Sequence, residues 1–393
     1  MLQSPSQAPD PRAAIIVCLD FGDSGYAESV EEVVRLVESA GVPRHRLVGG
    51  RRSRPDAKLY AGTGKVAEIL RAAEELNAAS VVFNHELSPG QQRNLEKALQ
   101  RRVLDRTELI LEIFAQRAQT SEGKLQVELA RLEHLSTRLV RGWSHLERQR
   151  GGLGKTGGPG EKQLELDRRY IAARIKVLKG KLDQLKKQRT VQRRSRVRRD
   201  VLSVSIVGYT NAGKSTLFNA LAHANAYAAD KLFATLDTTT RRVWLPEVGA
   251  HKAQTNAGNV VLSDTVGFVR DLPHGLVAAF RATLEETVHA DLLLHVVDAA
   301  SPAREAQAVE VDKVLAEIGA SDVPQLLVWN KIDLAALEPA VERDQYGRIS
   351  RVFTSARTGA GLKGLRGAIA EFARERSARG GAAASQSLPL QPH

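Results

Sequence analysis

The sequence predicts an α/β protein in three parts: an N-terminal α/β domain, a long antiparallel helical hairpin, and a C-terminal domain with a mostly parallel sheet and flanking helices. Three observations predict this class. Strand patterns alternate with helix patterns at both ends of the chain. Two heptad-spaced apolar runs flank a glycine-rich segment in the middle. The second α/β alternation opens on a strand that runs into a glycine-rich loop and then a helix.

The domain boundaries are predicted from changes in composition along the 393 residues. They define a loose lead-in (1–11), the N-terminal α/β domain (12–106), the basic helical hairpin (107–200), the second α/β domain (201–373) and a disordered, low-complexity tail (374–393). In the N-terminal domain the patterns predict strands at 14–19, 58–61 and 79–84 and helices at 26–40, 64–76 and 88–100. Ser88 is the expected N-cap of the last helix, with Pro89 in its first turn.

The net charge of +12 is concentrated in the middle of the chain. Residues 101–200 hold 26 Lys or Arg against 12 Asp or Glu, a net of +14, so the remaining residues are close to neutral at −2. A solvated helix face is the ordinary reason for a charge run, but a one-sign concentration of this size favours a nucleic-acid partner.

The sequence also excludes several classes of protein. Cys18 is the only cysteine, which rules out an intramolecular disulfide and a thiolate metal cluster. No stretch approaches the ~20 apolar residues of a membrane span, and the first residues lack a signal-peptide layout. We therefore expect a monomer in the cytoplasm, with peripheral membrane association as the alternative location.

The hairpin prediction rests on two apolar runs that step alternately by four and three residues, with Ser136 at the one missing apolar step of the first run. The first run is Leu125, Leu129, Leu132, Leu139, Trp143 and Leu146, and the second is Ile171, Ile175, Leu178, Leu182 and Leu185. Arms of ~30 residues would be roughly 45 Å long. The tip, Gly151–Gly160, is rich in glycine, and the second arm ends in a cluster of basic residues over 186–199. We expect the tip to approach RNA closely and the basic end to contact phosphates.

The strand at 201–207 leads into a phosphate-binding loop, Gly208-Tyr209-Thr210-Asn211-Ala212-Gly213-Lys214-Ser215-Thr216. The glycines allow backbone N–H groups to surround a β-phosphate, Lys214 brings a charge to the β- and γ-phosphates, and the Ser215 hydroxyl is a ligand suited to Mg²⁺. Gly154-Lys155-Thr156 has a similar ending, but position 149 is Gln149 instead of glycine and no strand precedes it.

Further elements follow in the order that a GTPase requires. A strand ends in Asp264-Thr265-Val266-Gly267, where Asp264 would reach Mg²⁺ and the Gly267 N–H the γ-phosphate. Another strand ends in Asn330-Lys331-Ile332-Asp333, and the Asp333 carboxylate can accept two hydrogen bonds from guanine that adenine cannot donate. The backbone of Ser355-Ala356-Arg357 can contact the base oxygen. A threonine between 233 and 240 should close over Mg²⁺, and spacing alone does not choose among four: Thr235, Thr238, Thr239 and Thr240.

Outside these motifs, three segments closely resemble the HflX family of ribosome-associated GTPases. They are RGGLGKTGGPGEKQLELDRR at 150–169, the stretch that begins at Asp105-Arg106-Thr107, and FATLDTTTRR at 233–242. The resemblance implies GTP as substrate, Mg²⁺ as cofactor, and binding to the large ribosomal subunit and its RNA, with splitting or rescue of ribosomes. It implies that Phe233, Ala234, Thr235, Leu236 and Asp237 border the nucleotide, and that Thr235 joins Ser215 and Asp264 as a metal ligand. The expected catalytic residues are therefore Lys214, Thr235 and Gly267.

The chain departs from that family pattern in Thr238, where many members have proline, and in its low-complexity end, where many have a further domain. Phe268 follows Gly267 where many GTPases place a glutamine that orients the attacking water, and phenylalanine cannot do so whether it faces the site or the core. Two other functions compete with ribosome splitting or rescue. One is a GTPase of subunit assembly or tRNA modification, and the other is a binding module with a purely structural G domain.

Overall fold

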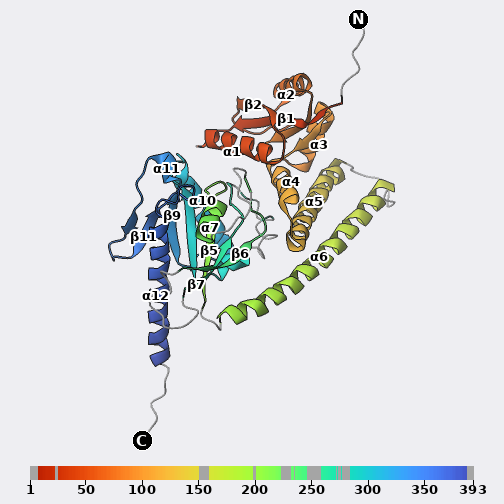
Figure 1. The fold of residues 1–393 in the computed structure, drawn as a ribbon. Coiled ribbons are helices and arrows are strands. Elements are labelled where there is room, and N and C mark those ends of the chain that lie inside the picture. Colours follow the sequence, from red (N-terminus) through yellow and green to blue (C-terminus); the bar gives the residue numbers. More distant parts are fainter. Residues whose placement is uncertain are drawn as a thin grey trace. The chain divides into compact units, whose positions relative to one another are not determined.

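The computed structural model of the chain describes residues 8–22, 25–149, 159–197, 201–222, 232–233, 235–245, 258–270, 272, 276 and 284–386 (Figure 1). The chain divides into two compact units. The N-terminal unit comprises Met1–Lys186, Lys231–Phe233 and Leu272–Ala279, and the C-terminal unit comprises Lys187–Asp230, Ala234–Asp271 and Phe280–His393. Two short pieces of the later sequence therefore belong to the N-terminal unit.

The N-terminal unit is built on a parallel four-stranded sheet in the order β2-β1-β3-β4. Its strands are β1 (Asp10–Asp20), β2 (Arg44–Arg51), β3 (Ala78–Phe83) and β4 (Arg102–Leu104). Its first helices are α1 (Tyr26–Ser39), α2 (Thr63–Leu76), α3 (Pro89–Leu99) and α4 (Arg106–Arg117). The sheet is parallel, as predicted, because each strand is followed by a helix that returns the chain to the same edge.

The alternation predicts most of these elements correctly, and α3 begins as expected. The Ser88 Oγ accepts from the Gln91 N–H at 3.2 Å, and the Gln91 side chain accepts from the Ser88 N–H at 3.0 Å. The predicted strand at 58–61 is wrong. That segment forms only an isolated bridge between Asp56 and Tyr60, and Tyr60 has a φ of 58°, which does not continue a strand. The strand is β2 instead, whose polar sequence has no apolar alternation and which is held by pairing with β1.

The predicted hairpin corresponds to α5 (Ser121–Gln149) and α6 (Pro159–Val197). Ion pairs join the two helices, Glu128 to Arg174 at 2.7 Å and Glu133 to Lys179 at 2.8 Å, and Leu178 is fully buried. The hairpin is not a separate compact unit, because both helices up to Lys186 cluster with the N-terminal sheet. Residues 151–158 of the predicted tip, Gly151–Gly160, lie outside the described residues, and α6 begins at Pro159, so the role of the tip stays a prediction.

The C-terminal unit contains a seven-stranded sheet in the order β10-β11-β9-β8-β5-β7-β6, antiparallel only at its two edge pairs. The strands are β5 (Leu202–Gly208), β6 (Thr239–Trp244), β7 (Asn259–Asp264), β8 (Leu292–Asp298), β9 (Gln325–Asn330), β10 (Val341–Arg343) and β11 (Ile349–Phe353). The helices are α7 (Lys214–Ala222), α10 (Arg304–Ile318), α11 (Ile332–Ala335) and α12 (Leu362–Gln386). One continuous apolar core joins the sheet to α7 and α12.

Both predicted disordered ends need correction. The helix α12 continues to Gln386, so disorder from residue 374 is wrong over 374–386, while 387–393 lie outside the described residues. The tail is rich in alanine and arginine, which are good helix formers, so it extends the helix instead of ending it. At the other end β1 begins at Asp10, inside the expected lead-in. None of the described helices is both long and apolar enough to cross a bilayer.

Candidate active site

The predicted phosphate-binding motif lies where strands of the C-terminal sheet end side by side. The chain leaves β5 at Gly208, β7 at Asp264 and β9 at Asn330, and these carboxyl ends share one edge of the sheet. Two positions in the loop require glycine. A Cβ at Gly208 would lie 2.3 Å from the Val296 carbonyl oxygen, and a Cβ at Gly213, where φ is +91°, would lie 2.2 Å from Nδ2 of Asn330.

Lys214 is the first residue of α7, so its charge stands at a helix N-terminus beneath the loop. Its side chain is buried, and its Nζ donates to the Tyr209 carbonyl at 2.7 Å. Burial lowers the pKa of Lys214 to about 8, although the nearby Asp264 carboxylate opposes that shift. A buried ammonium held by one carbonyl still has donors to offer, and a phosphate is the anion that this loop accommodates.

Three oxygens converge beside Lys214, and they come from the three predicted metal ligands. The Ser215 and Thr235 hydroxyls donate to Oδ2 of Asp264 at 2.6 and 2.9 Å, and the two hydroxyl oxygens lie 2.6 Å apart. This geometry favours Thr235 among the four candidate threonines, and its role as a metal ligand stays a prediction. Thr239 and Thr240 lie in β6, where the Thr240 hydroxyl is 3.1 Å from that of Ser263.

The Asp264 carboxylate is incompletely satisfied. It is 2% exposed, and its Oδ1 has no hydrogen-bond partner among the described residues. Burial raises the pKa of Asp264, whereas the Ser215 hydroxyl and the Lys214 charge act in the opposite direction. A buried carboxylate oxygen with no partner beside two hydroxyls is a donor set suited to a hard cation such as Mg²⁺.

The segment after Asp264 lies directly on the loop. The Phe268 backbone N–H donates to Gly208 at 3.2 Å, and its carbonyl accepts from Thr210 at 2.7 Å. A Cβ at Gly267 would lie 2.9 Å from Nζ of Lys214, so the chain passes closely enough for its backbone to meet a ligand of that lysine. The Phe268 side chain is fully buried, which favours the core interpretation and leaves no side chain here to orient water. Val266 is buried too. The Thr265 hydroxyl donates to the Ile206 carbonyl at 2.7 Å, so the Thr265 side chain is bonded to β5 within the sheet.

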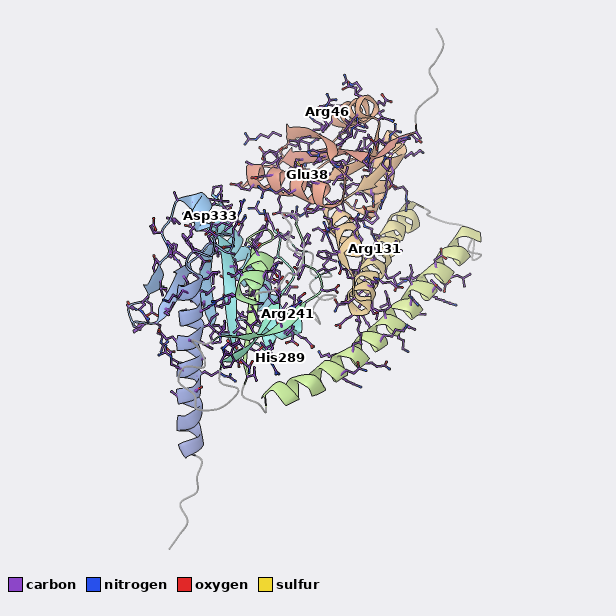
Figure 2. All side chains as sticks on the ribbon, in the orientation of Figure 1. Glu38, Arg46, Arg131, Arg241, His289 and Asp333 are labelled. Carbon is purple, nitrogen blue, oxygen red and sulfur yellow. The ribbon has the colours of Figure 1, made fainter. Side chains whose placement is uncertain are left out.

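The Asn330 side chain links the phosphate loop to the segment that follows β11 by two hydrogen bonds. Its Nδ2 donates to the Ala212 carbonyl and its Oδ1 accepts from the Ala356 N–H, both at 2.9 Å. These bonds hold the phosphate loop at a fixed distance from the segment Ser355-Ala356-Arg357. Asp333 is exposed at the start of α11, near the carboxyl end of β9 (Figure 2), and is free to accept from a ligand.

Sequence reasoning missed Asp298, which ends β8 and pairs with Lys331 at 2.7 Å. Lys331 has a φ of 63°, and its Nζ donates to Oδ2 of Asp298. An aspartate at the end of an apolar strand, one strand away from the phosphate loop, is the signal that could have identified it.

Other predicted site residues take different places. Asn211 has a φ of 60°, Tyr209 is buried with its hydroxyl accepting from the Arg270 N–H at 2.7 Å, and Leu236 is buried. The side chains of Thr216 and Asp237 are partly exposed, and Ala234 lies outside the described residues. That Phe233 borders the nucleotide stays a prediction. Its ring packs edge-on against Phe114 at 4.6 Å between centroids, within the N-terminal unit.

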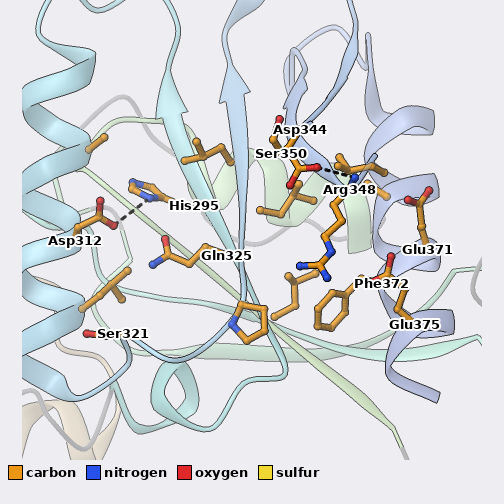
Figure 3. Close-up of a pocket in the computed structure, with 18 residues that line it drawn as sticks. His295, Asp312, Ser321, Gln325, Asp344, Arg348, Ser350, Glu371, Phe372 and Glu375 are labelled. Atoms are coloured by element: carbon orange, nitrogen blue, oxygen red, sulfur yellow. Dashed lines mark hydrogen bonds and ion pairs between the residues drawn. The ribbon is translucent and has the colours of Figure 1, made fainter. Parts of the chain in front are cut away.

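A cavity of about 800 Å³ opens at another part of the C-terminal unit (Figure 3). It is lined by side chains of β8, β9, α10, α12 and the β10–β11 turn, and none of the predicted site residues lines it. His295 lies in its wall with Nδ1 3.8 Å from Asp312, and burial lowers the pKa of His295 while Asp312 opposes that shift. The predicted chemistry is therefore grouped at the strand ends and not in this cavity.

Comparison with known proteins covers almost the whole chain. Residues 27–115 match the family described as "GTP-binding GTPase N-terminal", 117–196 match "GTP-binding GTPase Middle Region", and 203–331 match "50S ribosome-binding GTPase". The crystal structure of a GTP-binding protein from the archaeon Sulfolobus solfataricus in complex with GDP is 26% identical, with a TM-score of 0.46, and the match covers 92% of this chain and 99% of that one.

Two bacterial relatives are closer in sequence. The chain is 52% identical over 359 residues to the GTPase HflX of Escherichia coli (strain K12), covering 91% of this chain and 82% of the relative. It is 48% identical over 363 residues to the GTPase HflX of Magnetococcus marinus, covering 91% and 81%. With 52% identity over 91% of its length, the chain belongs to the HflX family of GTPases, enzymes that bind GTP and hydrolyse it to GDP and phosphate.

Proposed function

We propose that this GTPase binds the large ribosomal subunit when it holds GTP, and that it acts there as a nucleotide-switched factor in splitting or rescuing ribosomes. The observation that carries the proposal is the match of 203–331, which includes the whole phosphate site, to a family described as 50S ribosome-binding GTPases. Hydrolysis would end the bound state, because the segments around Thr235 and Gly267 lose the γ-phosphate that they contact.

The roles proposed within the site follow from its geometry. The loop from Gly208 to Thr216 would hold the β-phosphate, with Lys214 donating to the β- and γ-phosphates. Ser215, Thr235 and Asp264 would hold Mg²⁺, which neutralises charge on the phosphates when it is bound. The Gly267 N–H would contact the γ-phosphate and the Asp333 carboxylate the guanine base, with Ser355, Ala356 and Arg357 bordering that base.

The proposed RNA-binding surface is α6. This 39-residue helix holds 13 Lys or Arg and 4 Asp or Glu, and its length is about 58 Å at 1.5 Å per residue. Its basic residues between 168 and 187 are exposed or partly exposed, and two of them, Arg174 and Lys179, pair with acidic side chains of α5. Arg169 also pairs with Glu165 of the same helix at 2.6 Å, and the excess of positive charge on α6 would attract RNA phosphates.

The decisive measurement is cosedimentation with ribosomal particles. We expect the protein to pellet with isolated 50S subunits in the presence of a non-hydrolysable GTP analogue and to remain in the supernatant with GDP. Light scattering of 70S particles should then fall if the protein splits them. Binding only to 30S subunits or to precursor particles would instead support a role in subunit assembly, and no binding in either nucleotide state would reject the ribosomal role.

Charge variants test whether α6 is the contact. Replacing Arg193, Arg194 and Arg196 by glutamine should lower the slope of log affinity against log salt by about one unit for each lost phosphate contact. A matched control replaces three exposed basic residues of the C-terminal unit, Lys313, Lys363 and Arg374, with the same change in net charge. Equal effects from the two sets would mean that overall charge drives the association and α6 does not.

The hairpin tip is tested separately, by replacing Gly151–Gly160 with a short neutral turn. GTP affinity should be unchanged, because the nucleotide site belongs to the other compact unit. Ribosome binding and ribosome-stimulated hydrolysis should weaken together if the tip enters an RNA-lined cavity. Unchanged ribosome affinity at matched salt would contradict a role for the tip.

A further inference from the structure

Asp298 joins the carboxyl ends of two neighbouring strands, β8 and β9. Its Oδ1 accepts from the Ala300 N–H at 3.0 Å, and its Oδ2 accepts from Nζ of Lys331 at 2.7 Å. A backbone bond runs between the same segments, from the Ala299 N–H to the Asn330 carbonyl at 2.9 Å. The side chains of the ion pair are only 20% exposed for Asp298 and 23% for Lys331. The pair therefore fixes the Lys331 side chain to the end of β8.

The backbone of Lys331 has a conformation that needs support. Its φ of 63° and ψ of 34° lie in the left-handed region, which residues other than glycine rarely adopt. Such a conformation persists where the surrounding structure imposes it. Here the next residue, Ile332, donates its N–H to the Thr354 carbonyl at 3.3 Å, and Asp298 holds the Lys331 side chain.

The turn at Lys331 sets the place of Asp333. The helix α11 begins directly after Lys331, and Asp333 is its second residue. The Cα atoms of the two residues are therefore at most about 7 Å apart. A change in the φ and ψ of Lys331 would turn α11 and move the Asp333 carboxylate. The phosphate loop is held separately, because its Ala212 carbonyl accepts from the Asn330 side chain at 2.9 Å.

We infer that Asp298 is a positioning residue for guanine recognition: by holding Lys331 in its left-handed conformation, it keeps the Asp333 carboxylate where the base can donate to it. The inference rests on the base contact proposed for Asp333, and it is independent of any ribosomal role. Because the base is common to GTP and GDP, the loss of Asp298 should weaken both nucleotides alike.

A simple charge effect would act in the opposite direction. Asp298→Asn removes a negative charge near a site for a polyphosphate and leaves Lys331 without its counter-charge, which by itself should strengthen nucleotide binding. The charge of Lys331 does act at the phosphate loop. Burial is the main cause of the lowered pKa of Lys214, Asp264 opposes that shift, and the Lys331 charge adds to it. The sign of the change in affinity therefore separates positioning from charge.

The test compares Asp298→Asn with Asp291→Asn, a matched control at the other end of β8. Asp291 also accepts one backbone N–H, that of Ser203 at 2.8 Å, and pairs with one cation, Arg376, at 3.2 Å. We expect Asp298→Asn to weaken binding of GDP and of a non-hydrolysable GTP analogue by about tenfold each. Asp291→Asn should lower the unfolding temperature by a similar amount without changing either affinity.

Inosine nucleotides report on the base contact itself. Inosine lacks the exocyclic amino group of guanine, so it can donate only one hydrogen bond to Asp333. The preference for GDP over inosine diphosphate should therefore fall in Asp298→Asn. Lys331→Met removes the same ion pair but changes the charge in the opposite direction, and it should lower this preference as well. A preference that stays at the wild-type value in both folded variants would overturn the inference.

A variant of Asp333 separates the possible failures. Asp333→Asn should lose the preference for GDP over inosine diphosphate; if it does not, the proposed base contact is wrong. If it does, but Asp298→Asn matches Asp291→Asn or binds nucleotide more tightly than the wild type, the positioning inference is wrong. A double-mutant cycle completes the test, because Asp298→Asn should have much less effect in an Asp333→Asn background. Full additivity would show that the two carboxylates act separately and would contradict the inference.

Discussion

Asp105 in the N-terminal unit and Asp264 in the C-terminal unit are both buried carboxylates, but only one is fully satisfied. Asp105 is 0% exposed, accepts from the Glu108 N–H at 2.8 Å at the start of α4, and forms an ion pair with Arg138 of α5. Asp264 is 2% exposed and receives both of its side-chain hydrogen bonds on Oδ2. Its Oδ1 is left without a hydrogen-bond partner among the described residues.

The difference distinguishes a carboxylate that is bonded within the fold from one that has an oxygen without a hydrogen-bond partner among the described residues. The partners of Asp105 come from α4 and α5, so the carboxylate joins the first arm of the hairpin to the sheet. An unsatisfied buried polar atom costs about 1–3 kcal/mol, and a protein retains it where a ligand later completes the site. The same residue type therefore has its bonding complete in one unit, whereas in the other one carboxylate oxygen has no hydrogen-bond partner among the described residues.

The largest expected effect comes from removing the positive charge of Lys214, which lies near Asp264. Lys214→Ala should reduce single-turnover GTP hydrolysis by at least about a thousandfold, because the charge on the transferred phosphoryl group is no longer stabilised. The unfolding temperature should change little, since the variant also removes a poorly solvated ammonium. Hydrolysis at the wild-type rate by the folded variant would mean that Lys214 lies outside the chemistry.

Exchanging the two carboxylates for amides tests the comparison directly. Asp264→Asn should lower Mg²⁺-dependent hydrolysis by about a hundredfold with little loss of stability, because the amide cannot complete a cation site. Asp105→Asn should lower the free energy of unfolding by about 1–3 kcal/mol, because Arg138 loses its buried carboxylate partner and keeps only Glu108, at 3.3 Å. Denaturant unfolding and hydrolysis per folded molecule measure the two effects. The comparison fails if both variants lose stability alike and keep activity.

Asp333 is a third kind of carboxylate, exposed and available to a ligand. Asp333→Asn should weaken GTP binding by more than about tenfold and shift preference toward xanthosine triphosphate, whose exchanged group faces the amide donor. Competition between the two nucleotides for a fluorescent analogue measures this shift. Unchanged GTP binding would remove Asp333 from the base site.

The smallest expected effect is the uptake of less than one proton by Lys214 when GTP binds. Burial lowers the pKa of Lys214 from 10.5 to about 8 in the ligand-free fold, so the unfolded chain binds more protons between these values. The free energy of unfolding should therefore rise with pH across that window.

Bound polyphosphate restores the charge of Lys214, so GTP binding at pH 8.5 to 9, chosen to be about one unit above that pKa, should take up a proton. Calorimetry in buffers of different ionisation enthalpy measures the uptake, which should vanish in Lys214→Ala; an uptake that persists there comes from another group.

Much of the nucleotide site is predictable from the sequence because its parts are local. The phosphate loop lies between a strand and a helix that are its immediate neighbours, and Asp264 and Asn330 end apolar strands, so short segments identify them. The pattern predicts a strand at 58–61 and not β2, because β2 has no apolar alternation of its own and exists through its pairing with β1. Low complexity predicts disorder from residue 374, whereas the alanine and arginine content of that segment favours the helix that the structure shows to Gln386.

The sequence by itself determined the fold class, the order of the GTPase motifs and the concentration of positive charge on the hairpin, because each depends on residues within one or two turns or strands. The tertiary structure alone decided which threonine joins Ser215 and Asp264, that Asn330 braces two loops, and that Phe233 belongs to the N-terminal unit. Each of those outcomes depends on side chains far apart in the chain. Such side chains meet only after both units have folded, when burial fixes which partners each polar group and ring can reach.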